Sequence, residues 1–208
     1  MIEFQQVCFT FDGKRVVDCF SQKINTGEHV ALMGESGAGK STIMKSLMGL
    51  ALPSSGRIVV DDVELTASSV QKIRSKIAWV PQEIQLPYTY VREALTAPFE
   101  LKVNQGKLFD EAKLYLLFEK VGLEKSLLDR RMQEISGGER QRVMLVLAIL
   151  LDKKILLLDE PTSAIDTQTR EKMIAFLKEL SVTLFAVTHD DSFAATCDRT
   201  FYISKIRE

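Results

Sequence analysis

The sequence predicts an α/β protein with a parallel-sheet core, a β-rich N-terminal part and a helical insertion. In the second half of the chain, near-continuous apolar runs such as residues 155–158 alternate with helix-like segments, which is typical of parallel strands covered on both faces. The first 24 residues read as a β-hairpin around an Asp12-Gly13 turn. Residues 83–135 contain no strand-like block and show the spacing of amphipathic helices.

The individual elements follow from the periodicity of the apolar residues. The sequence predicts strands at 2–11, 15–24, 29–33, 57–65, 76–82, 155–159, 183–189 and 199–205, and helices at 42–50, 91–102, 108–123, 140–151 and 168–180. We therefore expect a single domain, 1–208, whose α/β core comprises 1–82 and 137–208 and whose helical subdomain is 83–136.

Composition argues against several classes of function. The 208 residues contain 46% hydrophobic and 26% charged side chains with a net charge of −1, so charge gives no support for a nucleic-acid or anionic-membrane partner. Cys8, Cys19 and Cys197 form no CxxC, which predicts neither a zinc knuckle nor a disulfide framework and favours a reducing compartment. We expect no secretory signal, and the longest apolar run, 143–151, is too short to span a bilayer.

Residues 34–42, GESGAGKST, fit the phosphate-binding pattern G-x-x-x-x-G-K-[ST]. An apolar strand precedes the pattern and a helix follows it, as this loop requires, which argues against an ordinary glycine-rich turn. Lys40 would place a positive charge on the β- and γ-phosphate oxygens, and the Ser41 hydroxyl would ligate Mg²⁺. The candidate nucleotide-binding residues of the loop are Gly34, Glu35, Ser36, Gly37, Ala38, Gly39, Lys40, Ser41 and Thr42.

Two adjacent carboxylates, Asp159 and Glu160, end the apolar strand at 155–159. Successive strand residues point in opposite directions, so the two carboxylates need not share one role. Beside a phosphate loop, an aspartate at the end of a strand is the usual Mg²⁺ partner, which leaves Glu160 as the candidate general base for an attacking water. The alternative is a pair that only ends a strand at the surface.

Six segments together resemble the motifs of the nucleotide-binding subunit of ATP-binding cassette (ABC) transporters, of the small bacterial type. In order, they are GESGAGKST (34–42, Walker A), VPQE (80–83, Q-loop), ISGGERQR (135–142, signature), ILLLDEP (155–161, Walker B), SAID (163–166, D-loop) and VTHD (187–190, switch histidine). The resemblance implies a P-loop NTPase (RecA-like) core with an N-terminal antiparallel β subdomain, and Mg²⁺-dependent hydrolysis of ATP.

The resemblance also implies roles for single residues. Phe11 would stack on adenine, unless it is a core residue of its strand. Gln82 would contact Mg²⁺ and the attacking water, unless it is only a turn residue. His189 would contact the γ-phosphate, and Asp166 would cross to a partner subunit. His29 lies in no motif and is expected to be structural.

The signature segment is expected to complete the site of a second cassette. It contains no lysine, so its Ser136, Gly137 and Gly138 would form only half of a phosphate site. In the family that the chain resembles, two cassettes sandwich two ATP molecules head to tail, as a homodimer or a heterodimer. Glu139 stands where the family commonly has Gln, and the sequence leaves its effect open.

A separate transmembrane permease is the partner that the resemblance implies, gripped by the helical subdomain near residues 83–100. The chain would then lie in the cytoplasm, peripheral on the inner face of the plasma membrane. The overall likeness is to cassettes of metal (iron) exporters or lipoprotein-release systems. The alternative functions are a soluble ABC-type ATPase in cofactor assembly and one that remodels nucleic acid or ribosomes. An ordinary helix connection is the alternative for residues 83–100.

Overall fold

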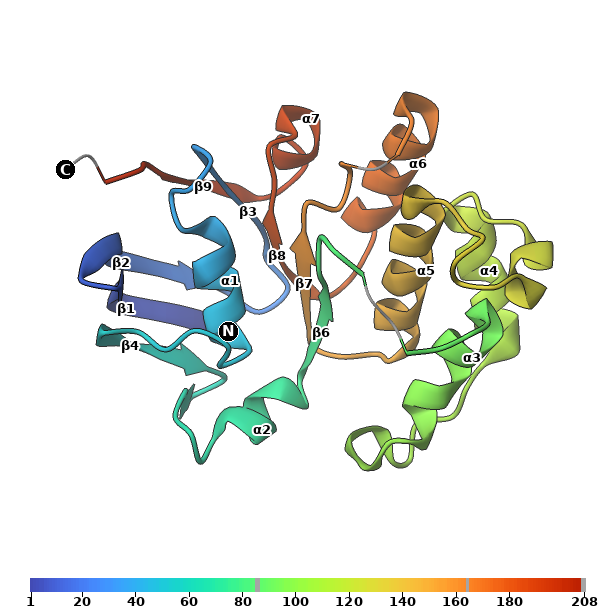
Figure 1. Cartoon of the computed structure of the whole chain (residues 1–208), viewed down its shortest axis with the longest axis horizontal. Coiled ribbons are helices and arrows are strands. Elements are labelled where there is room, and N and C mark those ends of the chain that lie inside the picture. Colours follow the sequence, from blue (N-terminus) through green and yellow to red (C-terminus); the bar gives the residue numbers. More distant parts are fainter. Residues whose placement is uncertain (85–86, 164, 207–208) are drawn as a thin grey trace.

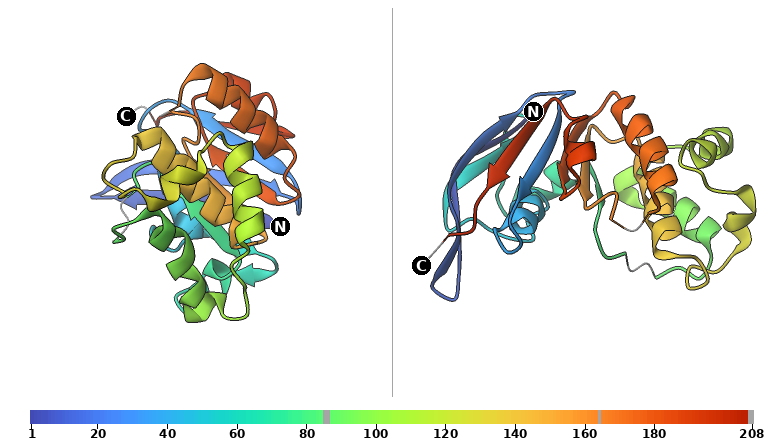
Figure 2. Two further views of the ribbon diagram at one scale, coloured as in Figure 1. Left: turned by 90° about the vertical axis from the view of Figure 1, so that its right-hand side faces the viewer. Right: turned by 90° about the horizontal axis from the view of Figure 1, so that it is seen from above.

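Two β-sheets organise the computed structural model, which describes residues 1–84, 87–163 and 165–206. One sheet is antiparallel, with the strand order β2-β1-β4-β5, and the other is parallel, with the order β6-β7-β8-β3-β9. In Figure 1 the antiparallel sheet and the helices α3 and α4 lie at opposite ends of the molecule, and the view from above in Figure 2 agrees. The predicted α/β fold with an antiparallel N-terminal sheet is confirmed.

The elements have the following bounds. The strands are β1 Ile2–Phe11, β2 Lys14–Ile24, β3 His29–Gly34, β4 Ser55–Val60, β5 Val63–Glu64, β6 Ile77–Val80, β7 Ile155–Asp159, β8 Thr183–Val187 and β9 Arg199–Ile203. The α-helices are α1 Lys40–Leu47, α2 Val70–Arg74, α3 Val91–Thr96, α4 Glu111–Lys120, α5 Gly137–Leu150, α6 Thr167–Lys178 and α7 Asp191–Ala194. Three 3₁₀ turns cover Ala97–Glu100, Lys102–Asn104 and Lys125–Asp129.

The parallel sheet is buried on both faces, as its apolar strands predict. In β7, Ile155 and Leu157 pack into a core with α1 and the antiparallel sheet. Leu156 and Leu158 pack into a second core with α3, α4, α5 and α6. This alternation follows from the two-residue period of a strand. Strand β7 therefore lies between the two hydrophobic cores and contributes side chains to both.

Several predicted elements differ in extent from the observed ones, and three of these differences have a local cause. The strand expected at 57–65 is two strands, because Asp61 and Asp62 take left-handed backbone angles, φ 47° and 61°, and turn the chain. The helix expected at 91–102 ends at Thr96 and continues as 3₁₀ turns, with Pro98 removing a backbone donor. The helix expected from residue 140 begins at Gly137, directly after the Ser136 cap.

The parallel direction of the strands brings distant motifs to one edge of the sheet. The phosphate loop follows β3, Gln82 follows β6, and His189 follows β8. Asp159 is the last residue of β7 and Glu160 comes next. Because the carboxyl ends of neighbouring parallel strands meet at the same edge, these side chains gather there. None of the helices in the described part of the chain has the length and apolar character needed to span a bilayer.

Candidate functional site

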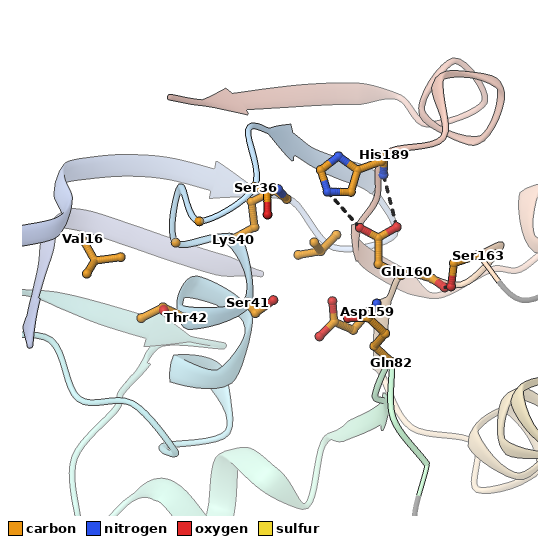
Figure 3. A pocket seen from close by; sticks show the side chains of 13 residues that line it. Val16, Ser36, Lys40, Ser41, Thr42, Gln82, Asp159, Glu160, Ser163 and His189 are labelled. Atoms are coloured by element: carbon orange, nitrogen blue, oxygen red, sulfur yellow. Dashed lines mark hydrogen bonds and ion pairs between the residues drawn. The ribbon is translucent and has the colours of Figure 1, made fainter. Parts of the chain in front are cut away.

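A pocket of 590 Å³ lies at this edge of the parallel sheet. Its lining residues are Val16, Ser36, Gly37, Gly39, Lys40, Ser41, Thr42, Gln82, Asp159, Glu160, Ser163, Val187 and His189. Figure 3 shows the phosphate loop and the start of α1 on one side of the pocket, with Asp159, Glu160 and His189 facing them. Ten of these thirteen residues belong to the predicted set, and Val16, Ser163 and Val187 do not.

The side chain of Lys40 folds back onto the phosphate loop to which it belongs. Its Nζ donates hydrogen bonds to the carbonyl oxygens of Gly34 and Glu35, at 2.8 and 2.9 Å, and only 6% of the residue is exposed. Burial lowers the pKa of Lys40, and the charges of Glu160 and Asp159 oppose that shift. The lysine therefore braces the loop and presents its positive charge to the pocket.

The phosphate loop requires glycine at position 39, where the chain turns into α1. Gly39 has φ 94° and directly precedes α1, in the left-handed region that favours glycine. A Cβ atom there would lie 2.4 Å from Cγ2 of Val17. The N–H groups in the first turn of α1 have no acceptor within the helix, and they lie beside the pocket, which suits a phosphate.

Asp159 carries an unsatisfied oxygen toward the pocket. The residue is 4% exposed, and its Oδ1 has no hydrogen-bond partner among the described residues. Burial, followed by the charge of Glu160, raises its pKa, while Lys45 and Lys40 lower it. Figure 3 places the carboxylate opposite the Ser41 hydroxyl, with Gln82 beside it. Carboxylate, hydroxyl and amide oxygens are the donors that Mg²⁺ prefers, so these residues fit that ion.

The backbone of Glu160 is strained and fixed by several hydrogen bonds. Its φ is 51°, unusual for a residue with a side chain, and such strain costs on the order of 1–3 kcal/mol. Its N–H donates to the carbonyl oxygen of Val187 at 2.9 Å. Its carbonyl oxygen accepts from Nε2 of Gln141 at 2.7 Å and from Oγ of Ser163 at 3.1 Å. These contacts hold the strained conformation and direct the carboxylate into the pocket.

Glu160 and His189 contact each other at the mouth of the pocket. The backbone N–H of His189 donates to Oε2 of Glu160 at 3.3 Å, and ring Nε2 lies 3.4 Å from Oε1 (Figure 3). The imidazole is 56% exposed, whereas the carboxylate is 12% exposed. The histidine is thus free to turn toward a ligand, while the carboxylate stays in place.

The signature segment lies outside this pocket and is organised as a helix cap. Oγ of Ser136 accepts from the N–H of Glu139 at 3.1 Å, and Oε2 of Glu139 accepts from the N–H of Ser136 at 2.8 Å. Arg140 donates to the carbonyl oxygens of Met132 and Ile135. Glu139 and Arg140 therefore fix the shape of the loop, and Ser136 and Gly137 remain exposed at its surface.

Several predicted residues are not brought into the pocket of a single chain. Among the residues described, Phe11, Gly34, Glu35, Ala38, Ser136, Gly137, Gly138 and Asp166 do not line it. Phe11 is 47% exposed at the end of β1, so it is not a core residue of the strand. Asp166 caps α6 by accepting from the N–H of Thr169 at 3.0 Å, which lowers its pKa. The predicted D-loop, 163–166, includes Ala164, and the predicted partner segment, 83–100, includes Gln85 and Leu86, which all lie outside the described residues.

Sequence reasoning missed four residues that shape the site. Val16 and Val187 line the pocket from β2 and β8, Ser163 lines it after β7, and Gln141 holds Glu160 from α5. Ser163 and Gln141 lie inside the D-loop and signature segments, so their place in a motif was a usable signal. His29, expected to be structural, contacts the carbonyl oxygen of Leu180 through Nε2 at 2.9 Å and is 9% exposed.

Residues 17–163 match the model of the ABC transporter family. The chain belongs to the ABC transporter family. The matched residues include both the phosphate loop, 34–42, and the signature segment, 135–142. The expected family and fold are therefore confirmed.

Two curated relatives and one solved structure illustrate the similarity. The carnitine transport ATP-binding protein OpuCA of Listeria monocytogenes is 36% identical over 91% of this chain, but the match covers 49% of that protein. The energy-coupling factor transporter ATP-binding protein EcfA2 of Streptococcus agalactiae is 32% identical over 90% of this chain and 72% of its own length. The chain thus spans about half the length of the first relative.

The structural comparison covers the whole chain. The dimeric, post-hydrolysis structure of the ATP-binding cassette MJ0796 with ADP and Pi matches with a TM-score of 0.87 and 27% identity. The match covers 100% of this chain and 97% of that chain. The chain therefore has the same fold as that cassette.

Proposed function

We propose that this chain is the ATP-hydrolysing subunit of a membrane transport system and that it works as a pair of cassettes. The observation that carries the proposal is the pocket in which Asp159, Glu160 and His189 face Lys40 and the rest of the phosphate loop. A buried lysine, a strained glutamate and an exposed histidine around one pocket suit phosphoryl transfer to water.

Glu160 is the proposed general base. Its carboxylate would accept a proton from water as the water oxygen attacks the γ-phosphorus, and the bond to the β–γ bridging oxygen would break to release ADP. Lys40 would stabilise the charge that develops on the phosphate oxygens, since its Nζ is already fixed at the loop. His189 would leave Glu160 and donate to the γ-phosphate.

Ser41, Gln82 and Asp159 are the proposed Mg²⁺ ligands. When bound, the ion would neutralise the charge of the β- and γ-phosphates. Asp159 suits this role because a buried carboxylate oxygen without a partner is costly unless a cation or donor meets it. Gln82 is exposed after β6, which lets its amide reach either the ion or the attacking water.

The adenine site is proposed for the tip of the β1–β2 hairpin. Phe11 is 47% exposed there, and its pairing partner in the sheet is Lys14. Val16, two residues further along β2, enters the pocket. An adenine ring that extends from the phosphate loop past Val16 would therefore meet the face of Phe11.

The exposed signature segment is the reason to propose a pair. Ser136 and Gly137 face solvent, with the capping box holding them in place. The start of α5 offers N–H groups and a positive helix end without a lysine. The start of α5 would bind the γ-phosphate that is held by Lys40 of a second copy or of a homologous cassette. Asp166 would reach across the same interface.

The helical subdomain, 83–136, is the proposed docking site for a separate transmembrane permease. It presents unusually exposed apolar side chains, among them Leu101, Val103, Leu108 and Leu116, and Leu108 is 90% exposed. Exposed apolar groups in the described part of this subdomain suit a protein partner better than solvent. The chain would then be held at the cytoplasmic face of the membrane through that permease.

The cargo expected from the sequence was that of a metal exporter or lipoprotein-release system. The two named relatives serve carnitine transport and energy-coupling factor transport, so this finer expectation finds no support among them. A role in cofactor assembly or on nucleic acid is not favoured either, since both relatives are transporter subunits.

The test uses the full chain and the Glu160→Gln variant. With MgATP, the variant should bind nucleotide and accumulate as a dimer in size-exclusion chromatography, while its hydrolysis falls about 10²–10⁴-fold. Affinity purification of the tagged chain from detergent-solubilised membranes should recover a membrane subunit. A variant that hydrolyses ATP at the parent rate would remove Glu160 as the base. Recovery of ribosomes or a soluble assembly complex instead would refute the transport role.

A further inference from the structure

A cluster of two thiols and a carboxylate lies on the β1–β2 hairpin, apart from the nucleotide pocket. Sγ of Cys8 lies 3.8 Å from Sγ of Cys19 and 3.6 Å from Oδ1 of Asp18. One ligand atom from each of the three residues lies within 4.8 Å of the other two. Cys8 is buried, while Asp18 and Cys19 face solvent, so an ion could enter and retain water on its outer side.

A bulge in β2 creates this cluster. Val7 pairs with Phe20, and Phe9 pairs with Val17, so Cys8 alone stands opposite the two residues Asp18 and Cys19. Consecutive residues of a regular strand point to opposite faces. Here Cys19 takes φ 47°, and the extra residue re-aims both side chains toward Cys8. Bulges of this kind commonly orient side chains at functional positions.

We infer that Cys8, Asp18 and Cys19 bind a thiophilic divalent cation, of which Zn²⁺ is the best match. Zinc bonds of about 2.3 Å to sulfur and about 2.0 Å to oxygen place tetrahedral ligands about 3.5–3.8 Å apart. The separations of 3.8 and 3.6 Å fall at this spacing before any rearrangement. Two thiols and one carboxylate favour Zn²⁺ over Mg²⁺. Binding releases both thiol protons to solvent and leaves a fourth position for water.

Arg15 competes for the same carboxylate. Its Nη1 lies 2.8 Å from Oδ1 of Asp18, and the two side chains are 55% and 49% exposed. An ion pair this exposed contributes little to the stability of the fold, so a metal ion can displace it. Removing the arginine should therefore strengthen zinc binding, because it frees the Asp18 carboxylate, whereas removing a metal ligand should weaken zinc binding.

The experiment titrates the reduced full chain with ZnCl₂ against a chromophoric chelator, in the presence of a phosphine reductant. We expect one bound Zn²⁺ per chain. Cys19→Ser and Asp18→Asn should each weaken binding by more than about tenfold, since loss of partners one shell further out already costs about 10–100-fold. Arg15→Gln should strengthen binding. Substitution by Co²⁺ should give a thiolate charge-transfer band that Cys19→Ser abolishes.

Two control variants separate this site from other metal-binding groups. Cys197→Ser removes the third thiol, and His189→Ala removes an exposed imidazole of the nucleotide pocket; both should keep parent zinc affinity. Zinc binding that survives Cys19→Ser would overturn the inference. So would a reduced chain that takes up no Zn²⁺ but forms a Cys8–Cys19 disulfide, with loss of two hydrogens, when oxidised glutathione accepts the electrons.

Discussion

The side-chain amide of Gln141 donates a hydrogen bond of 2.7 Å to the main-chain carbonyl oxygen of Glu160. Gln141 lies on α5, whose first turn contains the signature glycines. Glu160 directly follows β7 and carries the proposed base. The hydrogen bond therefore joins the part of the chain that would meet a partner's nucleotide to the part that would act on its own nucleotide.

Replacing Gln141 should slow hydrolysis more than it weakens nucleotide binding. Gln141→Leu leaves the buried carbonyl of Glu160 with fewer donors, which costs about 1–3 kcal/mol, and loosens a strained backbone at the base. We expect kcat to fall about tenfold, in line with a loss of 1.4 kcal/mol, with the Kd for ATP unchanged. Gln105→Leu, at an exposed position, should leave both constants at the parent value. An unchanged kcat in Gln141→Leu would contradict a positioning role.

Removing the loop lysine should abolish tight nucleotide binding. Lys40→Ala deletes a charge whose hydrogen bonds to phosphate are each worth about 1.5–3 kcal/mol, so the Kd for ATP should rise at least about tenfold. The measurement is fluorescence titration with a labelled ATP analogue. Lys72→Ala is the control, because Lys72 is an exposed lysine on α2 and does not line the pocket. Equal losses in the two variants would reject a specific role for Lys40.

The stability contributed by Glu139 should depend on pH. The backbone N–H of Ser136 lowers the pKa of Glu139 below its ordinary value of 4.5, against an opposing effect of burial. A lowered folded-state pKa means that the carboxylate's contribution is fully present above the unfolded pKa and is lost as pH falls through the folded pKa. Glu139→Gln keeps an accepting oxygen but no charge. Its free energy of unfolding should therefore lie below the parent's at neutral pH and approach it in acid.

Urea denaturation at neutral pH and at about pH 3.5 measures this difference, because the midpoint and slope give the free energy of unfolding. Glu139→Ala removes the cap contact as well and should cost about 1 kcal/mol at neutral pH. Glu119→Gln, on the exposed face of α4, serves as the control for loss of one negative charge. A gap between parent and Glu139→Gln that is constant with pH would exclude the charge as its source.

The parts of the site that the sequence predicts are those encoded by contiguous residues. Lys40 and Ser41 stand in one loop, and Asp159 and Glu160 end one strand, so local spacing and the parallel direction of the strands suffice to place them together. The signature segment around Ser136 was likewise recognised from contiguous residues, but the sequence did not predict the helix cap there. The role of Glu139 was left open by the sequence, because only the structure shows its oxygen accepting from Ser136.

The remaining features depend on contacts between distant segments. The side chains of Cys8 and Cys19 lie close together because of a bulge in β2, and no residue pattern predicts that bulge. The cysteines are scattered and form no CxxC, so the sequence predicted no zinc knuckle. Helix α3 ends at Thr96 because the chain passes into 3₁₀ turns around Pro98, where apolar spacing alone predicted continuation. Val16 enters the pocket because β2 pairs with β1 in a shifted register. Register and bulges are tertiary outcomes, and propensity does not determine them.

Mixed dimers should show whether the signature loop acts on the partner's nucleotide. Ser136→Arg places a long cation at an exposed cap and should spare ATP binding by the single chain, because Ser136 does not line that chain's pocket. It should prevent the nucleotide-dependent dimer of two Ser136→Arg chains, in which neither composite site has an intact signature. In a dimer of Ser136→Arg with Lys40→Ala, each composite site takes its phosphate loop from one chain and its signature from the other. One site therefore carries both substitutions, and the other carries neither. That dimer should retain about half of the parent's sites, whereas each variant alone should hydrolyse almost no ATP. If the mixture is as inactive as its components, the signature loop serves the pocket of its own chain, and the head-to-tail arrangement is wrong.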